Sequence, residues 1–228
     1  MAIILEENHD LPLCKLQITQ RVGSTSDQTA AGTAAYGGPA LSGLCNFASE
    51  LERRGAGGRT RAEIDEQLDS LGAGLQILCW HDQVLYEVMS LREHFERAVE
   101  ILADVVLRPD FPMDEGERLR RELLANLDEL RDDDSGLLHR FFARELYGDT
   151  PYGRPVAGTE ESTMALSLPT AQAWHRHHLV DGNLIVGAAG AVSASEIDGL
   201  LGKYFSAIPA GPRRDEAIPI PPARRGRK

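Results

Sequence analysis

Hydrophobic and polar residues follow two different periods along this chain. Short segments that alternate, or that are continuously apolar, predict β-strands at residues 2–6, 11–22, 75–80, 84–91 and 183–189. Apolar residues that recur every three or four positions predict amphipathic helices at residues 40–53, 60–71, 94–107, 114–131, 137–146, 170–178 and 194–205. Together these elements predict an α+β fold, with a mainly antiparallel sheet and helices packed on one side.

Local signals divide the chain further. Thr60, followed three residues later by Glu63, predicts a capping box at the start of a helix, and Gly72 predicts its end. Segment 23–42 is rich in Gly, Ala, Ser and Thr and predicts a mobile loop. We expect a single domain over residues 1–211, followed by a Pro- and Arg-rich linker or tail at 212–228. The glycine run at 55–58 follows a helix and not a strand, which argues against a phosphate-binding loop.

Charge and composition exclude several classes of function. The formal net charge of −11 disfavours nucleic acid and anionic membrane surfaces, because both require clustered Lys and Arg. No segment approaches the about 20 apolar residues of a membrane helix. The three cysteines are widely spaced and form no C-x-x-C pair, so we expect a reducing, cytoplasmic location. A periplasmic or secreted location is the alternative if a signal peptide has been removed.

One short segment, GLCNFASEL at residues 43–51, places three polar side chains on one helical face. Asn46, Ser49 and Glu50 have the spacing i, i+3 and i+4, which brings them to the same side of a helix. Zinc peptidases present metal ligands with this spacing, yet none of the three residues is histidine or cysteine. The pattern alone leaves three interpretations: a metal site, a metal site that has been lost, or the polar face of an ordinary helix.

The order of the elements resembles the pitrilysin-type zinc peptidases, which include insulinase and the mitochondrial processing peptidase. The resemblance extends from Ile3 to about Gly211. Its most specific segments are LREHFERAVEILADVVLRPDFPMDEGERLRREL at 91–123, LYGDTPYGRPVAGTEES at 146–162, AWHRHHLVDGNLIVGAAG at 173–190 and LLGKYFSAIPAG at 200–211. The resemblance implies the α+β domain of that family.

Active members of this family carry an inverted H-x-x-E-H motif, with two histidine ligands and a glutamate base, and a third glutamate ligand in the long charged helix. The resemblance places Asn46 and Glu50 at the histidine positions and Ser49 at the base. The third ligand falls near Asn126 and Leu127. We therefore expect a degenerate zinc site, no metal cofactor and no catalytic residue. Zinc belongs to the alternative reading, in which Glu122 serves from an adjacent turn.

Other groups of chemically reactive residues have simpler explanations. His175, His177 and His178 could bind a metal, but the last two point in different directions, which favours surface and core-edge histidines. Cys45 has no basic partner nearby in sequence, so we expect it to pack in the core and not to act as a nucleophile. The three acidic residues at 132–134 fit a solvated helix end better than a cation site.

The resemblance implies a non-catalytic subunit or domain that binds peptide and supports a catalytic partner. That partner is a second pitrilysin-type subunit or domain, and we expect a homodimer in isolation. An active zinc metalloendopeptidase and a stand-alone protein-binding module are the alternatives. Strand 75–80 is our candidate for holding a peptide by strand addition. Tyr152, Gly153 and Arg154 are candidates for contact with a partner or peptide.

Overall fold

The computed structural model describes residues 2–27 and 41–213. Five strands form one sheet in the order β1-β7-β2-β6-β5. Their bounds are β1 Ala2–Glu7, β2 Leu13–Gln20, β5 Gly74–Cys79, β6 Val84–Leu91 and β7 Leu184–Gly190. Pairing is antiparallel except between β1 and β7, which run parallel. The prediction of an α+β fold with a mainly antiparallel sheet is therefore confirmed.

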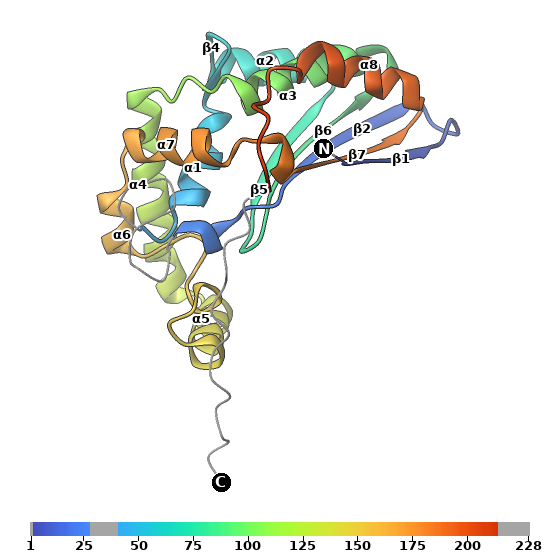
Figure 1. Cartoon of the computed structure of the whole chain (residues 1–228). Helices are drawn as coiled ribbons and strands as arrows, with labels where there is room; N and C mark the ends of the chain where they lie inside the picture. Colours follow the sequence, from blue (N-terminus) through green and yellow to red (C-terminus); the bar gives the residue numbers. More distant parts are fainter. Residues whose placement is uncertain (1, 28–40, 214–228) are drawn as a thin grey trace.

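Helices cover one face of the sheet and build a second body beside it (Figure 1). Helices α2, α3 and α8 lie over the sheet, while α1, α4, α6 and α7 pack together next to the β5 edge, and α5 lies farthest from the sheet. The helices are α1 Leu44–Glu52, α2 Arg61–Ser70, α3 Phe95–Leu107, α4 Met113–Glu129, α5 Asp134–Tyr147, α6 Glu160–Ala165, α7 Leu168–His178 and α8 Ala194–Tyr204. Within the described residues, no helix combines the length and apolar character needed to cross a bilayer.

The alternation of apolar and polar residues along each strand decides which face of the sheet is buried. In β2, Cys14, Leu16 and Ile18 are almost fully buried under the helices, whereas Lys15 and Gln17 alternate with them on the opposite face and are half-buried. Helix α3 covers β6 and β2 with a continuous apolar face, buried at Phe95, Ala98, Val99, Ile101, Leu102, Val105 and Val106. One buried core therefore lies between the sheet and the helical layer.

One local prediction is confirmed and two require correction. The capping box at Thr60 and Glu63 is present. The glycine run that follows α1 is not a simple helix end, because Gly57 and Gly58, at φ 62° and 76°, form the turn between the two-residue strands β3 (Gly55–Ala56) and β4 (Arg59–Thr60).

The predicted loop at 23–42 begins with a short 3-10 helix, η1 (Ser24–Asp27). This part of the prediction was wrong because Ser26 and Asp27 are buried and bonded to distant segments: Ser26 accepts from the indole N–H of Trp174, and Asp27 accepts from the backbone N–H of Gly43. Residues 28–40 of the predicted loop, and most of the predicted tail from residue 212, lie outside the described residues.

Candidate functional site

The start of α1 is fixed by a carboxylate from a distant segment. Gly43, in the position before the helix, has a φ of 89° and no side chain that could cap the helix. The buried carboxylate of Asp27 instead accepts hydrogen bonds from the backbone N–H groups of Gly43 and Cys45, each at 2.8 Å. A negative charge at a helix N-terminus satisfies the free N–H groups and the helix dipole. Asp27 of η1 thus fixes the position at which α1, the helix with the degenerate motif, begins.

Three of the four motif positions meet around one cavity. Asn46 and Glu50 of α1 and Asn126 of α4 line a cavity of about 750 Å³, together with Leu127. The remaining wall comes from the β5–β6 turn, from α4 and α5 and from segment 153–157, through His81, Leu123, Leu130, His139, Arg140, Phe142, Ala143, Tyr147, Gly153, Arg154, Pro155, Val156 and Ala157. The spacing that places Asn46 and Glu50 on one helical face therefore brings them opposite the position of the third ligand.

Ser49, at the position of the general base, does not line this cavity. Its side chain is 1% exposed, and its hydroxyl donates a hydrogen bond to the backbone oxygen of Asn46 at 3.2 Å. A serine in a helix commonly turns its hydroxyl back to the preceding turn in this way. The base position thus offers the cavity neither a carboxylate nor a free hydroxyl.

The donor set at the motif positions does not fit catalytic zinc. Such sites use three imidazole, thiolate or carboxylate ligands, whereas Asn46 and Asn126 contribute only neutral amides and Glu50 one carboxylate. Desolvation by the surrounding protein raises the pKa of the Glu50 carboxyl, although Arg54, Arg53 and Arg61 act to lower it. No cluster of three or more His, Cys, Asp or Glu suited to a metal ion occurs among the described residues.

Glu122, the alternative ligand, is engaged elsewhere. Arg54 is 6% exposed, and its guanidinium donates to Glu122 at 2.5 Å and to Glu115 at 3.2 Å. The hydrogen bond from Arg54 lowers the pKa of Glu122 against the effect of desolvation, and Arg118 lowers it further. Glu122 is not among the residues that line the cavity. This ion-pair network instead joins the segment directly after α1 to α4, the two helices that carry the motif positions of the cavity.

The three residues predicted to contact a partner or peptide, Tyr152, Gly153 and Arg154, lie beside the cavity, where Tyr152 and Arg154 contact the β5–β6 turn. Gly153 and Arg154 line it, while Tyr152 does not. The Tyr152 hydroxyl donates to Asp82 at 2.6 Å, and this bond raises the pKa of Tyr152 to about 12. A Cβ at Gly153 would lie 2.0 Å from the backbone oxygen of Gly148, so only glycine fits. This segment therefore packs the turn between β5 and β6 against the cavity wall.

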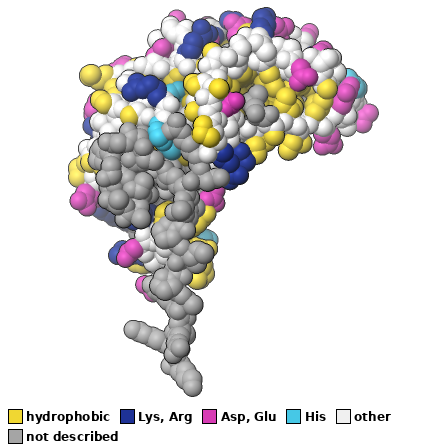
Figure 2. Space-filling view, viewed as in Figure 1, with side chains coloured by type: hydrophobic (Ala, Val, Ile, Leu, Met, Phe, Trp, Pro, Cys, Tyr) yellow, Lys and Arg dark blue, Asp and Glu magenta, His cyan; other side chains and the backbone are white. Residues whose placement is uncertain are grey.

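Strand β5 borders the same region and is an edge of the sheet. It pairs only with β6 among the described strands, and it contacts α1. Gln76 and Leu78 alternate outward along β5, and Trp80 follows it; Leu78 and Trp80 are 40% and 42% exposed. Figure 2 shows hydrophobic side chains gathered over the strands. Among the described residues, the candidate strand 75–80 thus has no second partner strand and carries exposed apolar side chains, both of which strand addition requires, although Arg53 donates to the backbone oxygen of Leu75 at 3.0 Å.

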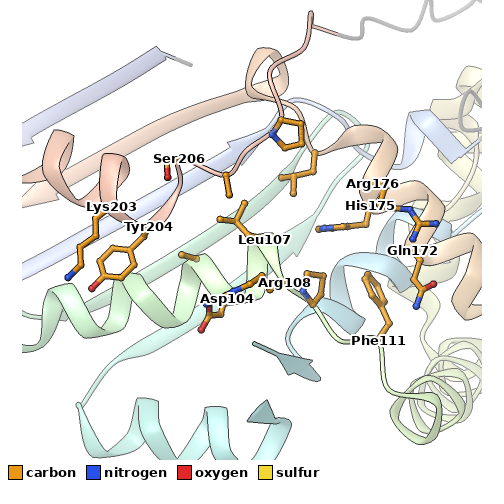
Figure 3. A pocket seen from close by; sticks show the side chains of 15 residues that line it. Asp104, Leu107, Arg108, Phe111, Gln172, His175, Arg176, Lys203, Tyr204 and Ser206 are labelled. Atoms are coloured by element: carbon orange, nitrogen blue, oxygen red, sulfur yellow. The ribbon is translucent and has the colours of Figure 1, made fainter. Parts of the chain in front are cut away.

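The predicted histidine group separates only in part. The rings of His177 and His178 do not point apart as predicted but lie in edge contact, with their centroids 4.7 Å apart, whereas His175 faces another element. His175 is 8% exposed, and its Nδ1 lies 2.9 Å from a carboxylate oxygen of Glu52, which is fully buried. His175 also borders a second cavity, of about 780 Å³, between α3, α7 and the segment after α8, with Phe111 at its edge (Figure 3). His178 packs on Trp174. Sequence reasoning missed the Glu52–His175 pair, because neither the buried carboxylate nor its distant partner leaves a local pattern.

The sequence matches the model of a known peptidase family. Residues 2–160 match Insulinase (Peptidase family M16), so the chain belongs to the M16 peptidase family. An uncharacterized zinc protease of Mycobacterium leprae is 30% identical over 169 residues, which are 74% of this chain and 38% of that protein. An uncharacterized zinc protease of Rickettsia felis is 24% identical over 169 residues, 74% of this chain and 41% of that protein.

Solved structures share the fold. A peptidase M16 inactive domain from Pseudomonas fluorescens superposes with a TM-score of 0.85 and 23% identity, covering 96% of this chain and 51% of that chain. A protease from Helicobacter pylori gives 0.77 and 18%, covering 93% of this chain and 49% of that chain. The chain thus spans about half of these structures and about two fifths of the curated relatives.

Proposed function

We propose that this chain is a non-catalytic domain of the M16 family, which binds peptide and supports a catalytic partner. The observation that carries the proposal is the donor set at the motif positions that line the first cavity. Two amides and one carboxylate replace the ligands that zinc requires, and the serine at the base position is turned to the backbone. Without a metal-bound water and a base to take its proton, peptide hydrolysis at this site has no nucleophile.

Strand β5 is the proposed peptide-binding element. An extended peptide added along this edge gains backbone hydrogen bonds, and its alternate side chains reach Leu78 and Trp80. The peptide would pass beside the cavity of Asn46 and Glu50, because α1 packs against β5. An M16-type scaffold with a degenerate metal site thereby keeps a surface that binds a chain without cutting it.

Helix α5 is the proposed surface for a partner. It lies farthest from the sheet (Figure 1), and it exposes a row of large apolar side chains, which are Leu138, Phe141, Phe142 and Leu146. Such a patch on one helix usually marks an interaction surface. Since the chain spans about half of the related structures, the proposed occupant is a second α/β domain of the same family, in a catalytic subunit or in a second copy.

The proposal is tested by metal content, hydrolysis and binding together. We expect elemental analysis to find well below one zinc per chain, and a quenched fluorescent peptide mixture to remain uncleaved. Stoichiometric zinc that is lost in Glu50→Ala, together with cleavage, would instead establish an active zinc endopeptidase.

Peptide binding is measured by the anisotropy of a fluorescein-labelled peptide mixture of random sequence. Leu78→Lys should weaken binding at least about fivefold, because a lysine on an edge strand opposes strand addition. Met89→Lys is the matched control, since Met89 is similarly exposed but lies on the inner strand β6, whose two sides are already paired with β5 and β2. Equal effects of the two substitutions, or no binding by the wild-type chain, would refute the role of β5.

A further inference from the structure

Two thiols from different elements meet beside the degenerate motif. The Sγ atoms of Cys45 and Cys79 are 3.0 Å apart, and neither cysteine is part of a disulfide. Cys45 lies in the first turn of α1, and Cys79 is the last residue of β5. It is the only thiol–thiol contact among the cysteines, all of which the structure describes. The two sulfur atoms would have to approach by only about 1 Å to reach the about 2.05 Å length of a disulfide bond.

The backbone on both sides of this pair is anchored by the same short segment. Asp27 of η1 accepts the N–H group of Cys45 at 2.8 Å. The N–H group of Ser24, at the other end of η1, donates to the backbone oxygen of Trp80 at 2.9 Å, directly after Cys79. Since η1 holds both cysteines through the adjoining backbone, the two thiols are kept close in the folded state and do not meet by chance.

The two thiols differ in access to solvent. Cys45 is fully buried, whereas Cys79 is half-buried. Burial raises the pKa of the Cys45 thiol well above its usual value, and the neighbouring Cys79, Asp27 and Glu52 all raise it further. A reagent from solvent therefore reaches Cys79 first, and Cys45 is placed to react second.

We propose that Cys45 and Cys79 are a redox modification site, which a small-molecule disulfide of the glutathione type converts into a disulfide bond. In the first step the Cys79 thiol loses its proton to water, and its sulfur attacks one sulfur of the reagent. The reagent's S–S bond breaks and one thiolate leaves. In the second step the Cys45 thiol loses its proton to water, and its sulfur attacks Cys79 Sγ and displaces the second thiolate, which takes up a proton. Two protein thiols lose two electrons, and one reagent disulfide becomes two thiols.

The bond would join the helix that carries Asn46 and Glu50 to the edge strand of the sheet. It would close a loop that contains β3, β4 and α2, and so would restrict the relative motion of α1 and β5. A cross-link of this kind stabilises the folded state mainly by limiting the unfolded chain. This inference rests on the thiol geometry alone and does not depend on the proposed binding of peptide.

The experiment uses the full chain, equilibrated with mixtures of reduced and oxidised glutathione and then trapped with a maleimide. We expect the count of reactive thiols in denaturant to fall from three to one, with a loss of two hydrogens in the intact mass. Trypsin without reductant should release peptide 22–53 linked to peptide 62–92, while Cys14 stays free in peptide 1–15. The oxidised chain should melt about 5 °C higher than the reduced chain.

Cys14→Ser is the matched control, since Cys14 is buried in β2 away from this contact. It should oxidise as the wild type does, whereas Cys79→Ser should keep Cys45 reduced and lose the gain in melting temperature. A glutathione adduct that remains on Cys79, a disulfide between two chains, or oxidation accompanied by loss of the far-ultraviolet circular dichroism would each overturn the proposal.

Discussion

Replacing Arg54 by methionine tests whether ion pairing holds the wall of the first cavity. Methionine keeps most of the apolar stem but removes the guanidinium that donates to Glu122 and Glu115. Removing one partner of a buried ion pair costs about 3–5 kcal/mol. The Glu122 side chain is 40% exposed and therefore partly screened by solvent, so we expect a loss of about 2 kcal/mol in the free energy of unfolding at pH 7. For a chain of this length the melting temperature should fall by about 4–8 °C.

The pH dependence of this loss identifies its cause. Arg54 lowers the folded-state pKa of Glu122, so the pair contributes stability above the unfolded pKa of glutamate, about 4.3, and this contribution is lost as the pH falls through the folded pKa. Urea unfolding of the wild type and Arg54→Met should therefore differ by about 2 kcal/mol at pH 7 and by less than about 1 kcal/mol near pH 3.

A second arginine on the same carboxylate is the control for this test. Arg118 contacts Glu122 at 3.1 Å, but its side chain is 57% exposed, so Arg118→Met should cost less than about 1 kcal/mol. A loss for Arg54→Met that does not change with pH would show that packing, and not charge, is responsible. Equal losses for both substitutions would refute the distinction between the buried and the exposed pair.

Three other outcomes are expected. The three motif residues that line the cavity should form a zinc site after the replacements Asn46→His, Glu50→His and Asn126→Glu, and calorimetry should then give one zinc per chain. Replacing Leu127 by Glu, in place of Asn126→Glu, tests whether the third-ligand position is shifted by one residue, and adding Ser49→Glu tests whether a restored base gives peptidase activity. Asp27→Ala should cost about 2 kcal/mol, because two buried N–H groups lose their acceptor, and should speed hydrogen exchange at Gly43 and Cys45. Sedimentation should show a dimer that persists or strengthens as salt screens the −11 charge and that Phe141→Glu disrupts; a monomer in both low and high salt contradicts this.

Most of the fold can be predicted from the sequence, because its elements are long and regularly periodic. Helix α3 and strands β2 and β6 lie where the hydrophobic period places them. The parallel pairing of β1 with β7 could not be predicted, since no local pattern states which distant strand an edge strand will join. The sequence predicts a loop in place of η1 for the same reason, because the partners of η1 lie at the start of α1 and in the β5–β6 turn.

The candidate site is predictable only where its residues share one helix. The spacing of Asn46 and Glu50 places both on the cavity, and the resemblance supplied Asn126 from another helix. The same rule grouped Ser49 with them, although its hydroxyl is taken by the preceding turn. No sequence pattern marks Glu52, and only the tertiary structure buries it against His175. The contact between Cys45 and Cys79 likewise depends on how α1 packs on β5.

The central position of β2 in the sheet has a consequence for synthesis of the protein. Strand β2 is made well before β7, yet β7 is one of its neighbours, with Cys14 paired to Gly190. A nascent chain that has completed β6 therefore still presents one side of β2 as an open edge, and β1 has no partner until β7 appears. Pairings between such distant segments fold slowly, and open strand edges attract other chains. The elongating chain should thus be most prone to aggregation while α3 to α7 are being synthesised, and ribosome-bound chains that end before Leu184 should engage chaperones.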